Sequence, residues 1–197
     1  MKYYHIGFSH CGCSSLYCAF QQIGIWYPEL NINILRTPRT FGLIKTNKEF
    51  KEYPFKYLEE YNVFIETNMD NYDEKNLVWK YIAEYTDNVK FILTLRDPID
   101  VALSYFKHEY NFTQKIDSKH ILKDNKKIIQ DLYAIKIMQT KYADLIKDYF
   151  VDTPERLLVM NICNGDGYEK LLPFMGLDVP NKIPSFPHKN EHDITKI

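Results

Sequence analysis

The feature that most constrains the fold is an N-terminal sequence in which an apolar run, a glycine-containing loop and an apolar-periodic segment follow one another. The run Tyr3–Phe8 is apolar and aromatic and predicts a strand. The segment Ser14–Ile23 carries apolar residues at helical spacing and predicts a helix. A strand, a glycine loop and a helix N-terminus in this order build an anion site from backbone N–H groups. We therefore expect a phosphate-binding loop after the first strand.

The loop differs at one position from the loop that binds nucleoside triphosphates. Gly7, Gly12 and Ser14 fit the spacing G-x-x-x-x-G-K-[ST], but Cys13 stands where that loop has lysine. The lysine reaches the β- and γ-phosphates, and a cysteine cannot replace its charge. The sequence thus favours a phosphate ligand over a triphosphate.

A second motif lies near the middle of the chain. The continuous apolar run Val89–Leu95 predicts a buried strand, and Asp97 can cap a helix predicted over Pro98–Tyr110. Arg96 then lies at the carboxyl end of the strand, where parallel sheets bind their ligands. Ser104 follows about two turns along the helix. A guanidinium in this place suits a phosphate.

Periodicity predicts the remaining elements. Further strands are expected at Asn62–Glu66 and Arg156–Ile162, and further helices at Glu74–Tyr85, Asn125–Phe150 and Gly167–Met175. Strands that alternate with helices predict a mainly parallel sheet with right-handed crossovers. In the longest helix the apolar residues expected to face the core are Ile128, Leu132, Ile135, Met138, Tyr142, Leu145 and Tyr149.

The two motifs together resemble the donor-binding signatures of the sulfotransferases that use 3′-phosphoadenosine 5′-phosphosulfate (PAPS). The family's R-[DN]-P-x-x-x-x-x-S is matched completely by residues 96–104. Its loop K-x-G-T-[ST] is matched in part by residues 10–14, with His10 at the lysine and Cys13 at the threonine. Further similarity, in the same order along the chain, covers residues 157–162, 165–171, 173–177 and 186–190.

The resemblance implies both a fold and a reaction. The fold would be α/β and three-layered, with a mainly parallel sheet flanked by helices and the phosphate-binding loop after the first strand. The reaction would move a sulfuryl group from PAPS to a hydroxyl or amine acceptor, with adenosine 3′,5′-bisphosphate as product and no metal. The acceptor would be a small molecule or a glycan.

The resemblance also implies the residues that bind the donor. These are Cys11, Gly12, Cys13, Ser14, Ser15, Arg96, Ser104 and Lys189. Backbone N–H groups and hydroxyls of the loop would hold the 5′-phosphosulfate. Arg96 and Ser104 would take the 3′-phosphate, the arginine as a bidentate donor. Lys189 would close over the same phosphate, as basic residues near the family's C-terminus do; a solvated lysine is the alternative reading.

Two residues are candidates for the chemistry. His10 aligns with the family lysine that donates to the bridging oxygen of PAPS, and an imidazolium can do the same. The alternative is an exposed His10, with a lysine or arginine from elsewhere in its place. Glu66 ends a predicted strand. Cytosolic members of the family carry a histidine base two residues after this position, but here that place is taken by Asn68, which cannot accept a proton. Glu66 is therefore the candidate base, a cap or ion pair being the alternative.

Length and charge limit the other possibilities. A chain of 197 residues suits one domain over residues 1–197, and a formal net charge of −1 disfavours a nucleic-acid partner. No apolar run reaches the roughly 18 residues of a membrane span, and no signal sequence is evident, so the cytoplasm is the expected compartment. The four cysteines lack zinc-site spacing and are expected to be reduced thiols.

Two other functions stay open at this point. A phosphate-loop kinase of a small molecule is disfavoured by Cys13 and by the lack of an Asp-terminated strand for magnesium. A non-catalytic relative that binds the nucleotide is favoured by the missing loop lysine and the missing histidine base.

Overall fold

Strands and helices alternate along the chain in the computed structural model, which describes residues 1–8, 10–36, 39–49, 51–65, 77–104 and 125–188. The side chains of residues 39–43, 125–129 and 131–132 are outside this description. The strands are β1 (Lys2–His5), β2 (Ile34–Arg36), β3 (Val63–Ile65), β4 (Val89–Thr94) and β5 (Leu157–Met160). The α-helices are α1 (Cys13–Trp26), α2 (Arg39–Glu49), α3 (Val78–Tyr85), α6 (Asn125–Tyr149) and α7 (Tyr168–Met175), with a further helical segment at 98–104. Short 3-10 turns are η1 (Pro28–Leu30), η3 (Pro154–Arg156) and η4 (Ile162–Asn164).

The five strands form one sheet in the order β2-β3-β1-β4-β5, and each neighbouring pair is parallel. β1 lies between β3 and β4, with His5 opposite Ile92. After β1 the chain forms β2 at one edge of the sheet, returns to place β3 beside β1, and then continues on the other side with β4 and β5. The carboxyl ends of β1 and β4 are therefore the switch point of the sheet, where open α/β folds bind ligands. The predicted α/β fold is confirmed.

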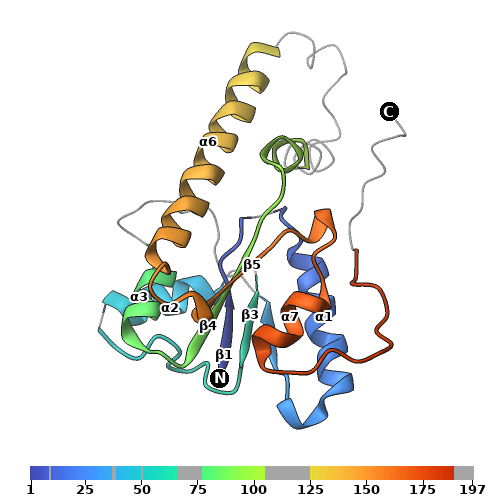
Figure 1. The fold of residues 1–197 in the computed structure, drawn as a ribbon. Coiled ribbons are helices and arrows are strands. Elements are labelled where there is room, and N and C mark those ends of the chain that lie inside the picture. The colour runs from blue at the N-terminus through green and yellow to red at the C-terminus, as the bar shows by residue number, and fades with distance from the viewer. Residues whose placement is uncertain (9, 37–38, 50, 66–76, 105–124, 189–197) are drawn as a thin grey trace.

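Helices cover both faces of the sheet (Figure 1), with α1 and α7 on one face and α2, α3 and α6 on the other. Side chains alternate between these layers because successive residues of a strand point to opposite faces. Tyr4 and Phe91 enter the core beneath α3 and α6, whereas Tyr3 and Ile92 enter the core beneath α1 and α7. The molecule thus has the three layers that the sequence predicted.

The core on the α6 side is aromatic, and it fixes the C-terminal end of that helix. Phe91 of β4 lies with its ring centroid 5.0 Å from that of Phe150, which follows α6 directly. Trp79 of α3 contacts the same ring at 6.0 Å. Aromatic pairs at these distances add to the stabilisation from burial, so these contacts stabilise the packing of the C-terminal end of α6 against the sheet. The other half of α6 extends beyond the carboxyl ends of the strands (Figure 1).

The predicted core stripe of α6 is correct only in part. Tyr142 is buried and Ile135 and Tyr149 are half-buried, but Met138 and Leu145 are 40% and 36% exposed. The residues that face the core together with Tyr142 are Gln139, Ala143, Ile146 and Phe150. The predicted stripe repeats about every 3.5 residues, and an α-helix of 3.6 residues per turn rotates such a stripe away from a straight contact line. Ile128 and Leu132 lie outside the described side chains.

Two elements were not predicted, and several boundaries differ. β2 and α2 lie in a part of the sequence that showed no motif. β2 is a strand of three residues at the edge of the sheet, and none of them is buried. An alternation of apolar and polar residues over so few positions cannot be recognised in a sequence. The first strand ends at His5 rather than Phe8; the apolar run is longer than the strand because Ile6 and Phe8 are buried in the loop that follows. Within the described ranges, no helix has the length and apolar character needed to cross a membrane.

Candidate functional site

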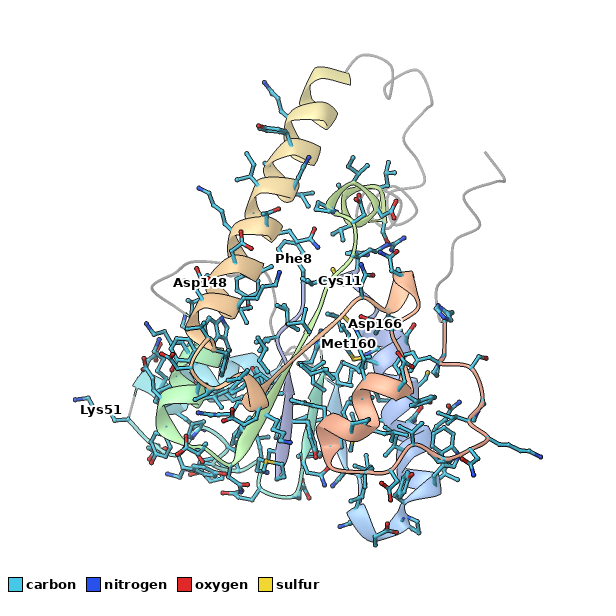
Figure 2. All side chains as sticks on the ribbon, in the orientation of Figure 1. Phe8, Cys11, Lys51, Asp148, Met160 and Asp166 are labelled. Carbon is cyan, nitrogen blue, oxygen red and sulfur yellow. The ribbon has the colours of Figure 1, made fainter. Side chains whose placement is uncertain are left out.

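The loop between β1 and α1 lies at the carboxyl end of the sheet, over the junction of β1 and β4. Ile6 N still donates to Ile92 O at 2.9 Å, so the loop leaves the sheet directly beside β4. Figure 2 shows Phe8 and Cys11 beyond the ends of the strands, on the same side as the upper part of α6. The loop and the segment after β4 are therefore neighbours.

Gly7 allows this close approach. A Cβ atom at Gly7 would overlap the Thr94 hydroxyl and lie 2.5 Å from His5 Nε2. His5 and Thr94 are themselves buried and share a 2.7 Å hydrogen bond between Nε2 and Oγ1. The first turn of the loop thus packs on a polar pair that bridges the two central strands, and only glycine fits there.

Gly12 begins α1 in a conformation suited to an anion site. It is the N-cap residue, has a left-handed φ of 95° and offers no side chain to cap the helix. Leu16 N donates the first bond of the helix, to Gly12 O at 2.9 Å. The N–H groups of Cys13, Ser14 and Ser15 precede that bond, at the end of the helix where backbone N–H groups point outward. Backbone N–H groups in this position, with the positive end of the helix dipole, bind phosphate groups.

The side chains of the two loop cysteines point into the protein. Cys11 and Cys13 are both buried, and Cys13 Sγ lies 3.8 Å from Phe8 O as a weak donor. Burial raises the pKa of the Cys11 thiol well above its usual value, the nearby Cys13 and Cys163 act in the same direction, and Arg96 opposes them. A neutral, buried Cys11 is a core residue, so the two cysteines can contribute only their backbone to a ligand.

The loop serines differ in exposure and in partners. Ser15 is buried, whereas Ser14 is half-buried at the start of α1. Arg36 Nη2 donates to Ser14 Oγ at 2.9 Å, and the Arg36 guanidinium carbon lies 5.2 Å from the ring centroid of Tyr17. Arg36 is the last residue of β2, and no sequence motif had singled it out. Its strand is short and distant in sequence from the loop, so only the parallel sheet brings it there.

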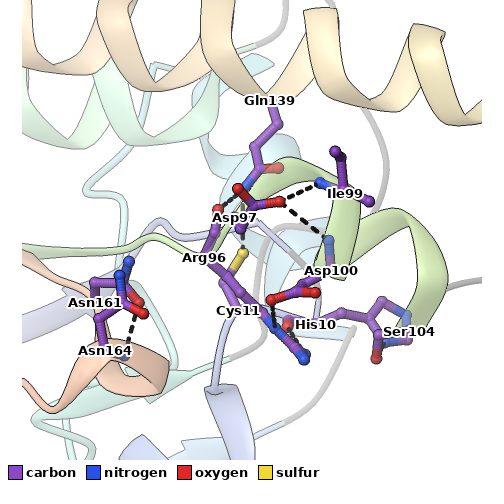
Figure 3. Close-up of polar contacts among 10 residues, drawn as sticks. All are labelled: His10, Cys11, Arg96, Asp97, Ile99, Asp100, Ser104, Gln139, Asn161 and Asn164. Carbon is purple, nitrogen blue, oxygen red and sulfur yellow. Dashed lines mark hydrogen bonds and ion pairs between the residues drawn. The ribbon is translucent and has the colours of Figure 1, made fainter. Parts of the chain in front are cut away.

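His10, Arg96 and Ser104 come together at the end of β4 (Figure 3). His10 Nδ1 lies 3.1 Å from Ser104 Oγ, and Arg96 Nη1 donates to His10 O at 3.4 Å. Asp97 caps the helical segment 98–104 as predicted, since its Oδ1 accepts from Ile99 N at 2.8 Å. The residues from the two sequence motifs therefore occupy one cluster.

Gln139 of α6 completes this cluster from above, as Figure 3 shows. Its Nε2 donates to Arg96 O at 3.2 Å and lies 3.5 Å from Cys11 Sγ. The side chain is buried, and its Oε1 has no hydrogen-bond partner among the described residues. The sequence does not single out Gln139, because a glutamine in a long polar helix gives no signal that distinguishes a buried position from an exposed one.

Two predicted site residues, Glu66 and Lys189, lie outside the described residues. β3 ends at Ile65, which pairs in register with Arg36 of β2. The roles of Glu66 and Lys189 therefore stay predictions. In the described part of the chain, no three His, Cys, Asp or Glu side chains are grouped so as to hold a metal ion.

The geometry offers two groups of hydrogen-bond donors at the carboxyl edge of the sheet. One consists of the N-terminus of α1 with Ser14 and Arg36, and the other of Arg96 and Ser104 with His10. Such an arrangement suits a ligand that carries two anionic groups. A comparison with protein families matches residues 4–194 to the family described as "Sulfotransferase domain". A search of curated proteins found no match to the chain.

Proposed function

Because the chain belongs to the sulfotransferase domain family, we propose that it moves a sulfuryl group from PAPS to a hydroxyl or amine acceptor, a small molecule or a glycan. The observation that carries this proposal is the cluster of His10, Arg96 and Ser104, in which the residues of both donor-binding motifs meet at the switch point of the sheet. The donor substrate has two anionic groups, and the site has two groups of donors.

In this assignment the 3′-phosphate binds at Arg96 and Ser104. Arg96 is permanently charged and presents several N–H groups in a fixed plane, which suits a phosphate. The backbone N–H groups from Gly12 to Ser15, with the Ser14 and Ser15 hydroxyls, hold the 5′-phosphosulfate. Lys189 is proposed to close over the 3′-phosphate.

The reaction requires one bond to form as another breaks. The acceptor oxygen or nitrogen forms a bond to sulfur while the bond from sulfur to the bridging oxygen breaks, and that electron pair stays on the departing phosphate. His10 donates a hydrogen bond to the bridging oxygen as charge develops there. Glu66 accepts the proton that the acceptor loses. The protein thus supplies charge stabilisation and a base, the two requirements of the transfer.

The test is a transfer assay with labelled PAPS and a panel of alcohols, glycans and amines. We expect label to appear in at least one acceptor, and calorimetry to show that adenosine 3′,5′-bisphosphate binds more tightly than ATP with magnesium. Tighter binding of ATP with magnesium would instead support the kinase alternative. Bisphosphate binding without transfer to any acceptor would support the non-catalytic relative.

A further inference from the structure

The loop lacks the permanent charge that a phosphosulfate site needs. The family lysine performs two tasks at once, since it donates a hydrogen bond to the bridging oxygen and brings a full positive charge. His10, at the lysine position, can donate, but an imidazole is charged only when protonated. Its Nδ1 also lies against Ser104, on the side of the site assigned to the 3′-phosphate. A second cation is therefore needed at the sulfuryl end.

Arg36 lies at that end. Its Nη2 is 2.9 Å from Ser14 Oγ, and its guanidinium is 5.2 Å from the Tyr17 ring centroid. Ser14 and Tyr17 are one turn apart on α1, so the guanidinium lies along the first turn of the helix. The aromatic face and the serine together restrict its orientation. The charge is thus placed beside the helix N-terminus that would receive the 5′-phosphosulfate.

The hydrogen bond to Ser14 also has a defined direction. A guanidinium has only donors, so the Ser14 oxygen must be the acceptor. The guanidinium beside the Ser14 oxygen polarises the hydroxyl, which makes it a better donor to an anion. Arg36 can therefore act on an anion in the loop in two ways, directly through its N–H groups and through the Ser14 hydroxyl.

We propose that Arg36 is the cation that binds the 5′-phosphosulfate end of the donor, and that Arg36 and His10 divide the two tasks of the family lysine. This inference rests on the proposed function and adds a residue that neither motif contains. Arg36 supplies the permanent charge, and His10 supplies the hydrogen bond to the bridging oxygen. Arg36 pairs in register with Ile65, the residue before the candidate base Glu66.

The inference is tested by comparing nucleotides that lack one phosphate. Calorimetry is run with adenosine 3′,5′-bisphosphate, adenosine 3′-monophosphate and adenosine 5′-monophosphate. Arg36→Ala should weaken binding of the bisphosphate roughly tenfold or more, the effect of losing a hydrogen bond to a charged group. It should leave the 3′-monophosphate unaffected, because that ligand has no 5′-phosphate. Arg96→Ala should give the opposite pattern, with the loss confined to ligands that carry a 3′-phosphate.

Two further variants complete the design. Arg36→Lys keeps the charge but loses the planar donor geometry, so it should recover part of the bisphosphate affinity and part of kcat in the transfer assay. Lys147→Ala removes an exposed charge from the last turn of α6, about two turns from Gln139, and should leave every ligand unaffected. Ser14→Ala combined with Arg36→Ala should cost less than the sum of the two single changes, because both residues act on one group.

The outcomes separate this inference from the function on which it rests. If Arg36→Ala binds all three nucleotides like the wild type, or weakens the 3′-monophosphate as much as the bisphosphate, Arg36 does not serve the 5′ end. In that case transfer by the wild type would still support the proposed function. If the wild type binds none of these nucleotides and transfers no sulfate, the proposed function and the inference both fail.

Discussion

Gln139 of α6 donates its side-chain amide to the backbone carbonyl of Arg96 at 3.2 Å, and the same nitrogen lies 3.5 Å from Cys11 Sγ. One buried side chain therefore connects the long helix to both segments of the site, the loop after β1 and the segment after β4. Because the bond is to the main chain of Arg96, it fixes the backbone from which the Arg96 side chain extends. It does not involve the N–H groups of the guanidinium.

Replacing Gln139 by leucine should weaken ligand binding and lower the unfolding free energy only slightly. The change removes the donor to the Arg96 carbonyl, which is destabilising. It also removes the buried Gln139 Oε1, which has no hydrogen-bond partner among the described residues, and this partly offsets the loss. We expect a loss of unfolding free energy of about 1 kcal/mol in urea titration. Bisphosphate affinity should fall, but less than in Arg96→Ala. Gln130→Leu, at an exposed position of the same helix, is the control. Equal effects of the two changes would argue against a positioning role for Gln139.

The 3′-phosphate assignment predicts a large effect at Arg96 and a smaller one at Ser104. A hydrogen bond to a charged group contributes about 1.5–3 kcal/mol, so Arg96→Ala should weaken adenosine 3′,5′-bisphosphate binding roughly tenfold to a hundredfold. Ser104→Ala removes a neutral donor and leaves no charge unpaired, so its effect should be only a few-fold. Isothermal calorimetry measures both. Unchanged affinity in Arg96→Ala would rule out the assignment.

His10 should affect the rate of transfer more than donor binding. If it donates to the bridging oxygen mainly in the transition state, His10→Ala should lower kcat by on the order of 10²-fold and leave bisphosphate affinity almost unchanged. His10→Lys should recover much of the rate. Single-turnover transfer from labelled PAPS measures the chemical step. Equal rates in the wild type and His10→Ala would assign the hydrogen bond to another residue, with Lys189 the first to test.

The same residue predicts a pH dependence. An imidazole carries its charge below a pH of about 6.5 and loses it as the pH rises, whereas a lysine ammonium stays charged up to a pH of about 10. A protonated imidazole is a stronger donor to the bridging oxygen than a neutral one, so the contribution of His10 to the rate should follow its protonation. The wild-type rate should therefore fall as the pH rises through the neutral range, and it should also fall in acid, where a protonated Glu66 cannot accept the proton of the acceptor. His10→Lys should lack the fall through the neutral range, and a fall of the same size there in both proteins would locate the titrating group elsewhere.

Gly7 should be intolerant of any side chain for a steric reason. A Cβ there would meet the Thr94 hydroxyl, the Thr94 nitrogen and the His5 ring, all in the sheet core. Gly7→Ala should lower the unfolding free energy by about 1–3 kcal/mol or more, as overpacking does. Gly165→Ala is an informative comparison, because its φ is 96° but no atom lies within 4 Å of the added Cβ. Urea denaturation should show the smaller loss in Gly165→Ala, and the reverse order would contradict this account.

The parts of this fold that could be predicted from the sequence are those with a long regular pattern or a local chemical signal. β4 is a continuous apolar run, and the helix after it begins with an aspartate cap and a proline, so the start of each was correctly placed; the predicted end of the helix at Tyr110 lies outside the described residues. The glycine loop and the arginine-to-serine motif led to the family. These features are recognisable because neighbouring residues in the chain determine them.

The parts that could not be predicted depend on contacts between distant segments. Arg36 reaches the loop only because β2 is parallel to β3, and β2 has just three residues to reveal it. Gln139 faces the site because of the way α6 rotates against the sheet. That rotation also explains why Met138 and Leu145 are exposed where the apolar pattern predicted core residues. Packing between elements decides such positions, and one sequence carries little information about it.

The place of β1 in the sheet has a consequence for how the chain acquires its structure. β1 precedes both of its neighbours in the chain, and its pairing residues are Val63 and Phe64 of β3 and residues 89–92 of β4. A growing chain therefore carries an aromatic strand without partners until β3 and then β4 have been synthesised. Contacts of such long sequence separation form slowly and leave apolar surface exposed in the meantime. Nascent chains that stop before β4 should accordingly be the ones that chaperones retain, whereas chains that include it can close the centre of the sheet.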